Sequence, residues 1–71
     1  MNINTELRLI REGRRAYHAG ESAAPALNAE VIETIGDSPV GSLYTREAMC
    51  AFIWGYETER EHELAAILAE A

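Results

Sequence analysis

Residues 42–71 decide the fold of this chain; they read SLYTREAMCAFIWGYETEREHELAAILAEA. The segment contains no proline and ends in strong helix formers, which predicts one long helix or two helices with a break. Ser42 or Thr45 would cap its start. A continuous helix of about 28 residues would be about 42 Å long, more than two shorter helices can cover. Part of this helix should therefore project from the fold or pair with another surface.

The N-terminal part of the chain predicts a second helix, over residues 4–19. Large side chains recur there at spacings of three or four residues, which is the helical period; they are Leu7, Ile10, Arg14 and Tyr17. Asn4 or Thr5 would cap the start, and Gly20 would end the helix by adopting the left-handed conformation. Residues 21–25 are small or polar and suit a connector.

A shorter helix is predicted over residues 25–35. Pro25 tolerates the first helical position, Gly36 would end the helix, and apolar residues recur every four positions at Leu27, Val31 and Ile35. The β-branched run 31–35 also suits a strand, but a single strand without a partner is not stable. Residues 36–41 indicate a turn. The chain is thus predicted to be all-α: a small bundle of three helices, two short and one long, in a single domain over residues 1–71.

The long helix carries two apolar stripes that point in roughly opposite directions at 100° per residue. We expect the first stripe to pack on the other two helices; it contains Ala48, Met49, Phe52, Gly55 and Tyr56. The second stripe contains Leu43, Cys50, Ile53, Trp54, Leu64 and Leu68. Either the short second helix covers this stripe, or a second copy or a foreign partner does. A homodimer is the economical solution, with Leu64, Ile67 and Leu68 as its expected contacts.

Two glycines lie inside the helical patterns, Gly13 and Gly55. Each costs about 1 kcal/mol relative to alanine in a helix. A close approach of two helices would explain this cost. Simple tolerance on a solvent-exposed face is the alternative, and it suits Gly13 better than Gly55, which lies between two aromatic residues.

Length, charge and cysteine content narrow the class of protein. A chain of 71 residues buries only roughly 60% of the surface that its unfolded form exposes, so its core is small and self-association would help it. The net charge of −6 opposes binding to the phosphates of nucleic acid, so we expect no nucleic-acid partner. The N-terminus lacks a signal-peptide pattern. No apolar run reaches the ~18 residues of a membrane span. The lone Cys50 fits a reducing compartment. We therefore expect a cytoplasmic protein without a membrane partner.

No pattern of catalytic or metal-binding residues emerges. The run from His62 to Ala66 begins like the helical zinc-protease signature but lacks the second histidine. Cys50 lies between apolar neighbours, where a buried and inert thiol is the better interpretation. Alternating glutamates at 57, 59, 61 and 63 spread around a helix and indicate a solvated surface. We expect no enzyme activity, no metal and no cofactor.

Charged and aromatic residues instead suggest a protein-binding surface. Arg8, Arg11 and Arg15 lie on one side of the first helix. They could pair with the acidic segment 57–63 of the same or a second subunit, or bind acidic groups on a partner. Interface energy concentrates in tryptophan, tyrosine and arginine, although core burial is the expectation for Tyr56. The full set of predicted protein-binding residues is Tyr44, Arg46, Ile53, Trp54, Glu57, Arg60, Arg8, Arg11 and Arg15.

Two segments resemble a known pair of motifs. GRRAYHAG at 13–20 and AFIWGYE at 51–57 are similar to the motifs of ribosome modulation factor and of the CrpP-like phage-associated proteins. The turn motif of those families is reduced to Ser38-Pro39-Val40, residues 24–35 look inserted, and this chain is acidic where ribosome modulation factor is basic. The resemblance implies a small helical protein of a phage or another mobile element.

These observations together predict a small, acidic, non-enzymatic protein-binding module. The resemblance implies a phage-encoded modulator or inhibitor of a host protein in the host cytoplasm, for example a quorum-sensing regulator or a defence effector. A ribosome-associated stress or hibernation factor is one alternative. A structural dimerisation protein is the other.

Overall fold

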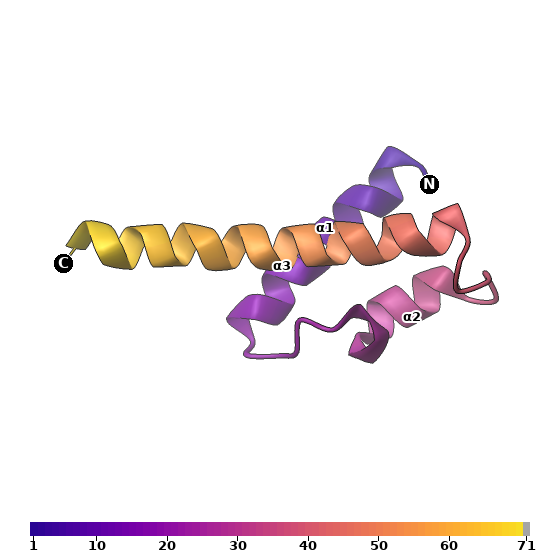
Figure 1. The fold of residues 1–71 in the computed structure, drawn as a ribbon, viewed down its shortest axis with the longest axis horizontal. Coiled ribbons are helices and arrows are strands. Elements are labelled where there is room, and N and C mark those ends of the chain that lie inside the picture. The colour runs from indigo at the N-terminus through magenta and orange to yellow at the C-terminus, as the bar shows by residue number, and fades with distance from the viewer. Residues whose placement is uncertain (71) are drawn as a thin grey trace.

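The structure, a computed structural model, describes residues 1–70, and this part of the chain is helical without a strand. Helix α1 spans Ile3–His18, a 3₁₀ turn η1 spans Pro25–Leu27, α2 spans Ala29–Ile35, and α3 spans Leu43–Glu70. Helix α1 crosses the first half of α3, and α2 lies beside the start of α3 (Figure 1). The prediction of an all-α bundle with two short helices and one long helix is confirmed.

Helix α1 begins at Ile3, one residue earlier than the sequence pattern indicates. The side chain of Asn2 accepts a hydrogen bond from the backbone N–H of Thr5 at 2.9 Å, so Asn2 is the N-cap and the predicted Asn4 or Thr5 is not. The predicted end is correct. Gly20 has φ +71°, and the N–H groups of Gly20 and Glu21 donate to the carbonyls of Tyr17 and Ala16. These two bonds form a Schellman motif, which satisfies the last free carbonyls of the helix.

The predicted helix over 25–35 is divided into η1 and α2. Asn28 has the extended backbone conformation, φ −99° and ψ 122°, which interrupts the helix. Its side-chain oxygen accepts from the N–H of Val31 at 3.1 Å, so Asn28 caps the α-helix, and Pro25 opens only the 3₁₀ turn. The division also brings the buried Asn28 amide to Glu12 of α1, where it donates a hydrogen bond of 2.8 Å.

Helix α3 is continuous over 28 residues, which resolves the choice between one long helix and two. Ser42 caps its start, because the hydroxyl oxygen of Ser42 accepts from the N–H of Thr45 at 3.2 Å. The core lies where α1 and α2 meet the first half of α3. Its buried apolar residues are Leu9, Ala16, Val31, Ala48, Ala51 and Phe52. The first predicted stripe therefore packs as expected, with Met49 and Tyr56 at the edge of the core.

The crossing of α1 and α3 depends on the two helical glycines. A Cβ atom placed on Gly13 would lie 2.7 Å from the amide nitrogen of Tyr56 and closer still to the carbonyl oxygen of Phe52. A Cβ on Gly55 would lie 2.8 Å from the carbonyl carbon of Ile10 and would overlap its oxygen. Close helix contact is thus confirmed for both glycines, and Gly13 does not lie on a solvent-exposed face.

The second half of α3 extends beyond the other helices (Figure 1). Every residue from 60 to 70 is exposed, and Leu68 retains 73% of its accessible surface. The second apolar stripe is not covered by α2, since Leu43, Ile53, Trp54 and Leu64 are exposed as well. Cys50 is also exposed, so the predicted buried thiol is wrong. The reason is angular: Cys50 lies about 200° around the helix from Ala48, which faces α1.

Candidate protein-binding surface

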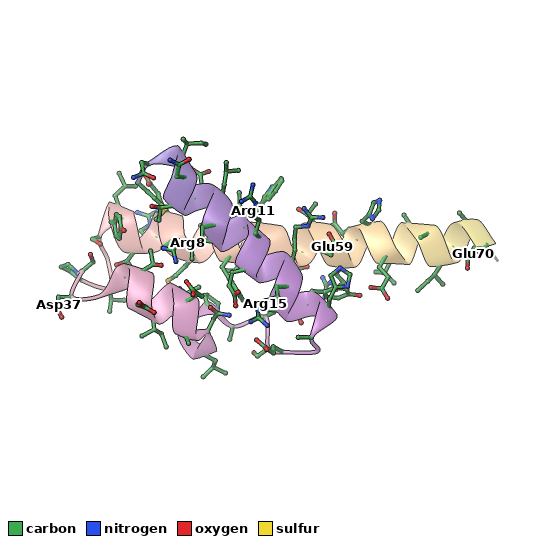
Figure 2. The ribbon with its side chains drawn as sticks, turned by 180° about the vertical axis from the view of Figure 1, so that it is seen from behind. Arg8, Arg11, Arg15, Asp37, Glu59 and Glu70 are labelled. Carbon is green, nitrogen blue, oxygen red and sulfur yellow. The ribbon has the colours of Figure 1, made fainter. Side chains whose placement is uncertain are left out.

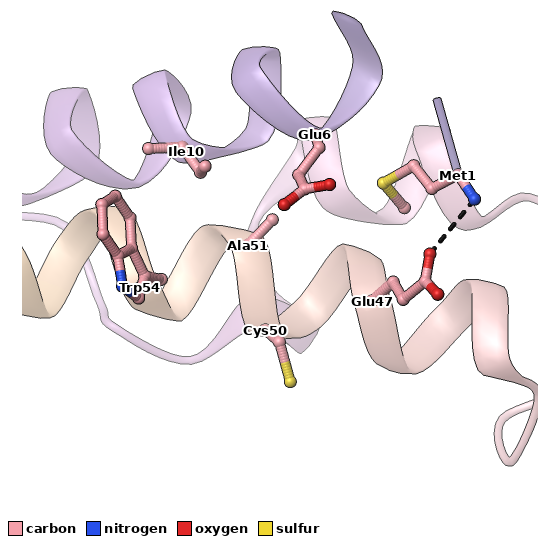
Figure 3. A pocket seen from close by; sticks show the side chains of 7 residues that line it. All are labelled: Met1, Glu6, Ile10, Glu47, Cys50, Ala51 and Trp54. Carbon is pink, nitrogen blue, oxygen red and sulfur yellow. Dashed lines mark hydrogen bonds and ion pairs between the residues drawn. The ribbon is translucent and has the colours of Figure 1, made fainter. Parts of the chain in front are cut away.

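A groove runs between the N-terminal half of α1 and the facing side of α3. We call it the tryptophan groove; its lining residues are Met1, Glu6, Ile10, Glu47, Cys50, Ala51 and Trp54. Figure 3 shows Trp54 and Ile10 at one end of the groove and Met1 with Glu47 at the other. The small Ala51 side chain lies between these two ends, which leaves the groove open along its length.

Local helix geometry explains why Trp54 lines this groove while Phe52 does not. Two residues along a helix correspond to about 200° of rotation, so the two aromatic side chains leave α3 in opposite directions. Phe52 is completely buried, whereas Trp54 keeps 59% of its surface exposed. The prediction that these two residues cannot face one surface is confirmed. A largely exposed tryptophan beside an apolar groove is a feature of protein-binding surfaces.

Carboxylates lie along the same groove. The amino group of Met1 donates a hydrogen bond of 3.1 Å to Glu47, and the dashed line in Figure 3 marks this pair. Glu6 lines the groove as an exposed carboxylate and enters no ion pair within residues 1–70. The groove therefore combines apolar walls with a negative rim.

The apolar surface continues from the groove along α1. Ile3, Leu7 and Ile10 share one face because they are spaced four and three residues apart, and Ile3 and Leu7 are exposed. The sequence pattern alone did not indicate a binding role for Ile3, Glu6, Ile10 or Glu47. The spacing of the three apolar residues was the available signal, but sequence alone did not show that this face adjoins Trp54.

The predicted arginine patch is not an open basic surface. Arg8 donates to Glu30 at 2.5 Å and to Thr34 at 2.9 Å, both on α2. Arg15 donates to Glu12 and Glu21, which raises the pKa of Arg15 and lowers that of Glu12, with the Glu12–Arg15 hydrogen bond as the largest cause in each case. Figure 2 shows both arginines along α1, with Arg11 between them.

Pairing of these arginines with segment 57–63 of a second subunit stays a prediction, but within residues 1–70 Arg8 and Arg15 do not pair with that segment. Arg14 and His18 make that contact, through hydrogen bonds of 2.9 and 2.8 Å to the two carboxylate oxygens of Glu59. Arg14 lies about 100° around α1 from Arg15, on the side that meets the second half of α3. Arg11 takes part in no ion pair among the described residues.

The remaining predicted residues lie on the outside of α3. Arg46, Ile53, Glu57 and Arg60 follow one another at spacings of seven, four and three residues, and Arg60 donates to Glu57 within this row. The predicted dimerisation residues Leu64 and Ile67 continue the row, with Leu68 beside it. Tyr44 lies about 200° from Arg46 and faces another direction. The structure thus separates most of the predicted binding residues into the groove, the outside of α3 and the paired Arg8 and Arg15, and it places Tyr44 and Arg11 in none of these groups.

Residues 1–70 hold no group of three or more histidine, cysteine or acidic side chains that could bind a metal ion. None of the helices in this part of the chain is both long enough and apolar enough to span a bilayer.

The Glu59 cluster predicts a specific dependence of stability on pH. The hydrogen bonds from His18 and then Arg14 lower the pKa of Glu59 below its ordinary value of 4.5. A carboxylate whose pKa is lower in the folded state stabilises the fold at every pH above its unfolded-state pKa. This stabilisation is lost as the pH falls through the folded-state pKa. Glu59→Gln should therefore lower stability at neutral pH and reduce the loss of stability on acidification.

Urea unfolding followed by circular dichroism, at about pH 6 and about pH 3, measures this effect. Glu61→Gln is the matched control, because Glu61 is an exposed glutamate of the same helix that joins no ion pair within residues 1–70. Equal losses of unfolding free energy for wild type and Glu59→Gln between the two pH values would contradict the prediction.

Comparisons of this chain with protein-family models, with curated proteins and with solved structures found no match.

Proposed function

We propose that this chain is a non-enzymatic protein-binding module that engages its partner through the tryptophan groove. The observation that carries the proposal is the position of Trp54, the only tryptophan, which is 59% exposed at the end of an apolar groove. Burial of such a side chain against a partner is a major source of interface energy.

The chemistry of the groove indicates the kind of partner. Its walls are formed by Ile10, Ala51 and Trp54, and Glu6 supplies unpaired negative charge at its rim, whereas Glu47 pairs with the amino group of Met1. An apolar side chain flanked by lysine or arginine would complement both features. The net charge of −6 would also steer the chain towards a basic surface.

The resemblance to small phage-associated proteins extends this proposal to a phage-encoded modulator or inhibitor of a host protein, acting in the host cytoplasm. The two segments that carry the resemblance contact one another: the rings of Tyr17 and Tyr56 meet edge to face with centroids 5.4 Å apart. A quorum-sensing regulator and a defence effector remain the example targets. The proposal includes a homodimer, in which a second copy covers the exposed Leu64, Ile67 and Leu68.

An affinity experiment tests the proposed function. Immobilised wild-type protein is exposed to a bacterial lysate, in parallel with Trp54→Ala and with Ile32→Ala, a control on α2 whose side chain is similarly exposed at 54%. Trp54→Ala should weaken binding of the partner by more than about 2 kcal/mol, and should therefore lose proteins that the wild type and Ile32→Ala both retain. Circular dichroism should give equal helical content for all three.

Two results would contradict this proposal. Retention of the same proteins by all three immobilised variants would show that Trp54 is not part of the binding surface. Recovery of ribosomes, weakened by added salt and by substitution of Arg11, would instead support the alternative of a ribosome-associated factor. The pairing of Arg8 and Arg15 with carboxylates of their own chain leaves little basic surface for RNA, which is why this alternative ranks second.

A further inference from the structure

A row of residues with a seven-residue period runs along the outside of α3. We call it the outer stripe; its members alternate at spacings of three and four residues and are Leu43, Arg46, Cys50, Ile53, Glu57, Arg60, Leu64 and Ile67. Successive spacings of three and four place apolar residues along the seam of a coiled coil. The outer stripe therefore has the pattern of a helix that pairs lengthwise with another helix.

Nothing in residues 1–70 covers this stripe. The core contacts of α3 are made by Ala48, Ala51 and Phe52, which lie on the opposite side of the helix. Leu43, Ile53, Leu64 and Ile67 are all exposed. The row of exposed apolar residues is interrupted near its start by Arg46 and near its middle by a pair of opposite charges, Glu57 and Arg60.

This charge pair distinguishes between the possible arrangements of two copies. In a parallel pair, Glu57 would face Glu57 and Arg60 would face Arg60, and such like-charge layers oppose association. In an antiparallel pair centred between residues 58 and 59, Glu57 faces Arg60 of the second copy, and the reverse contact also forms. The neighbouring layers then join Ile53 to Leu64 and Cys50 to Ile67.

Other antiparallel registers lose this complementarity. If the centre moves to Gly55, Ile53 faces Glu57 and Cys50 faces Arg60 of the second copy. If it moves to His62, Glu57 faces Ile67 and Arg60 faces Leu64. Each shift places a charged group against an apolar side chain without its opposite charge, which is costly in an interface. The register centred between residues 58 and 59 matches apolar to apolar and acid to base at once.

We propose that two copies of this chain associate as an antiparallel pair of α3 helices, in this register, along the outer stripe. The inference rests on the homodimer of the proposed function and deepens it by naming the orientation and the contacts. The arrangement lays the projecting residues 61–70 of each copy along residues 47–56 of the other. The occupant is thus a second copy, because the stripe is complementary to itself under a two-fold rotation.

Disulfide trapping tests the register. In Ile67→Cys, the new thiol faces Cys50 of the second copy, so mild oxidation should give a covalent dimer on a non-reducing gel. The wild type should give none, because the two Cys50 residues lie 17 residues apart along the paired helices, about 25 Å. Cys50→Ala combined with Ile67→Cys is the control and should also stay uncrosslinked.

Charge reversal tests the central layer. Glu57→Arg and Arg60→Glu should each weaken self-association at least about tenfold, because each places like charges opposite one another. An equimolar mixture of the two variants should form a heterodimer, and the double variant should dimerise like the wild type. Both single variants lose the Glu57–Arg60 pair within their own chain, so recovery on mixing reports pairing between chains. Sedimentation equilibrium measures association, and circular dichroism confirms that each variant is folded.

The outcomes separate the two proposals. A wild type that remains monomeric at high concentration overturns the homodimer and its register together. A dimeric wild type whose Cys50 crosslinks to itself, or whose charge variants associate normally, overturns the register while the homodimer stands. Neither result bears on the partner captured through Trp54, which the affinity experiment measures separately.

Discussion

Gly55→Ala is expected to destabilise the fold by about 3 kcal/mol, because the new methyl group would overlap the backbone of Ile10. Helix propensity alone predicts the opposite sign, since alanine stabilises a helix interior by about 1 kcal/mol relative to glycine. Backbone atoms cannot rotate away as a flexible side chain can, so α1 and α3 would have to separate. In a domain of this size, the loss corresponds to a fall in Tm of about 12 to 24 °C.

Thermal unfolding followed by circular dichroism measures this effect, with Gly41→Ala as the matched control. Nothing lies within 4 Å of a Cβ placed on Gly41, and its φ is not positive. Alanine at that position should leave stability unchanged or raise it by up to about 1 kcal/mol. If Gly55→Ala were as stable as Gly41→Ala, the close crossing of α1 and α3 would be wrong.

Phe52→Ala is expected to cost about 3 to 5 kcal/mol, the usual loss for a fully buried aromatic side chain. Phe52 has no exposed surface and is the largest of the fully buried side chains. A domain of this length has a total stability on the order of 4 to 10 kcal/mol, so the variant should be partly unfolded at room temperature. The cavity would open in the core that Phe52 shares with Leu9 of α1 and Val31 of α2.

Trp54→Ala provides the comparison, since it removes a larger aromatic group two residues away. Trp54 is mostly exposed, so its loss should reduce the unfolding free energy by about 1 kcal/mol or less. Urea unfolding of both variants, at a concentration where sedimentation gives them the same oligomeric state, measures the difference. Similar losses for the two variants would mean that Trp54 contributes to the core and would remove it as a binding residue.

Most of the fold could be predicted because helix signals are local. The ends of α1 and α2 follow from Gly20 and Gly36. Both glycines have positive φ values, a backbone conformation that other residues rarely adopt. The division of 25–35 could not be predicted in the same way. Asn28 leaves the helical conformation and caps α2, and its amide then reaches Glu12 on a different helix. Periodicity contains no information about such a contact.

The candidate site was only partly predictable for a similar reason. The spacing of Phe52 and Trp54 alone predicts that one aromatic residue faces the core and the other does not. Identifying the partners of the arginines requires knowing how α1 and α3 cross. Because of that crossing, Glu59 pairs with Arg14 and His18. Arg8 instead pairs with Glu30 of α2, and Arg15 pairs with Glu21 of the connector.

The local amino-acid sequence was sufficient to predict the helical elements and the opposed directions of the apolar side chains on the last helix. These depend on hydrogen bonds and rotations within a few residues of each other. Only the tertiary structure decided that Gly13 and Gly55 allow two backbones to touch, that Cys50 is exposed and that Ile10 and Trp54 enclose a groove. The position at which two helices cross depends on packing between residues distant in the chain, and this packing places each side chain in the core, in the groove or on the outer stripe.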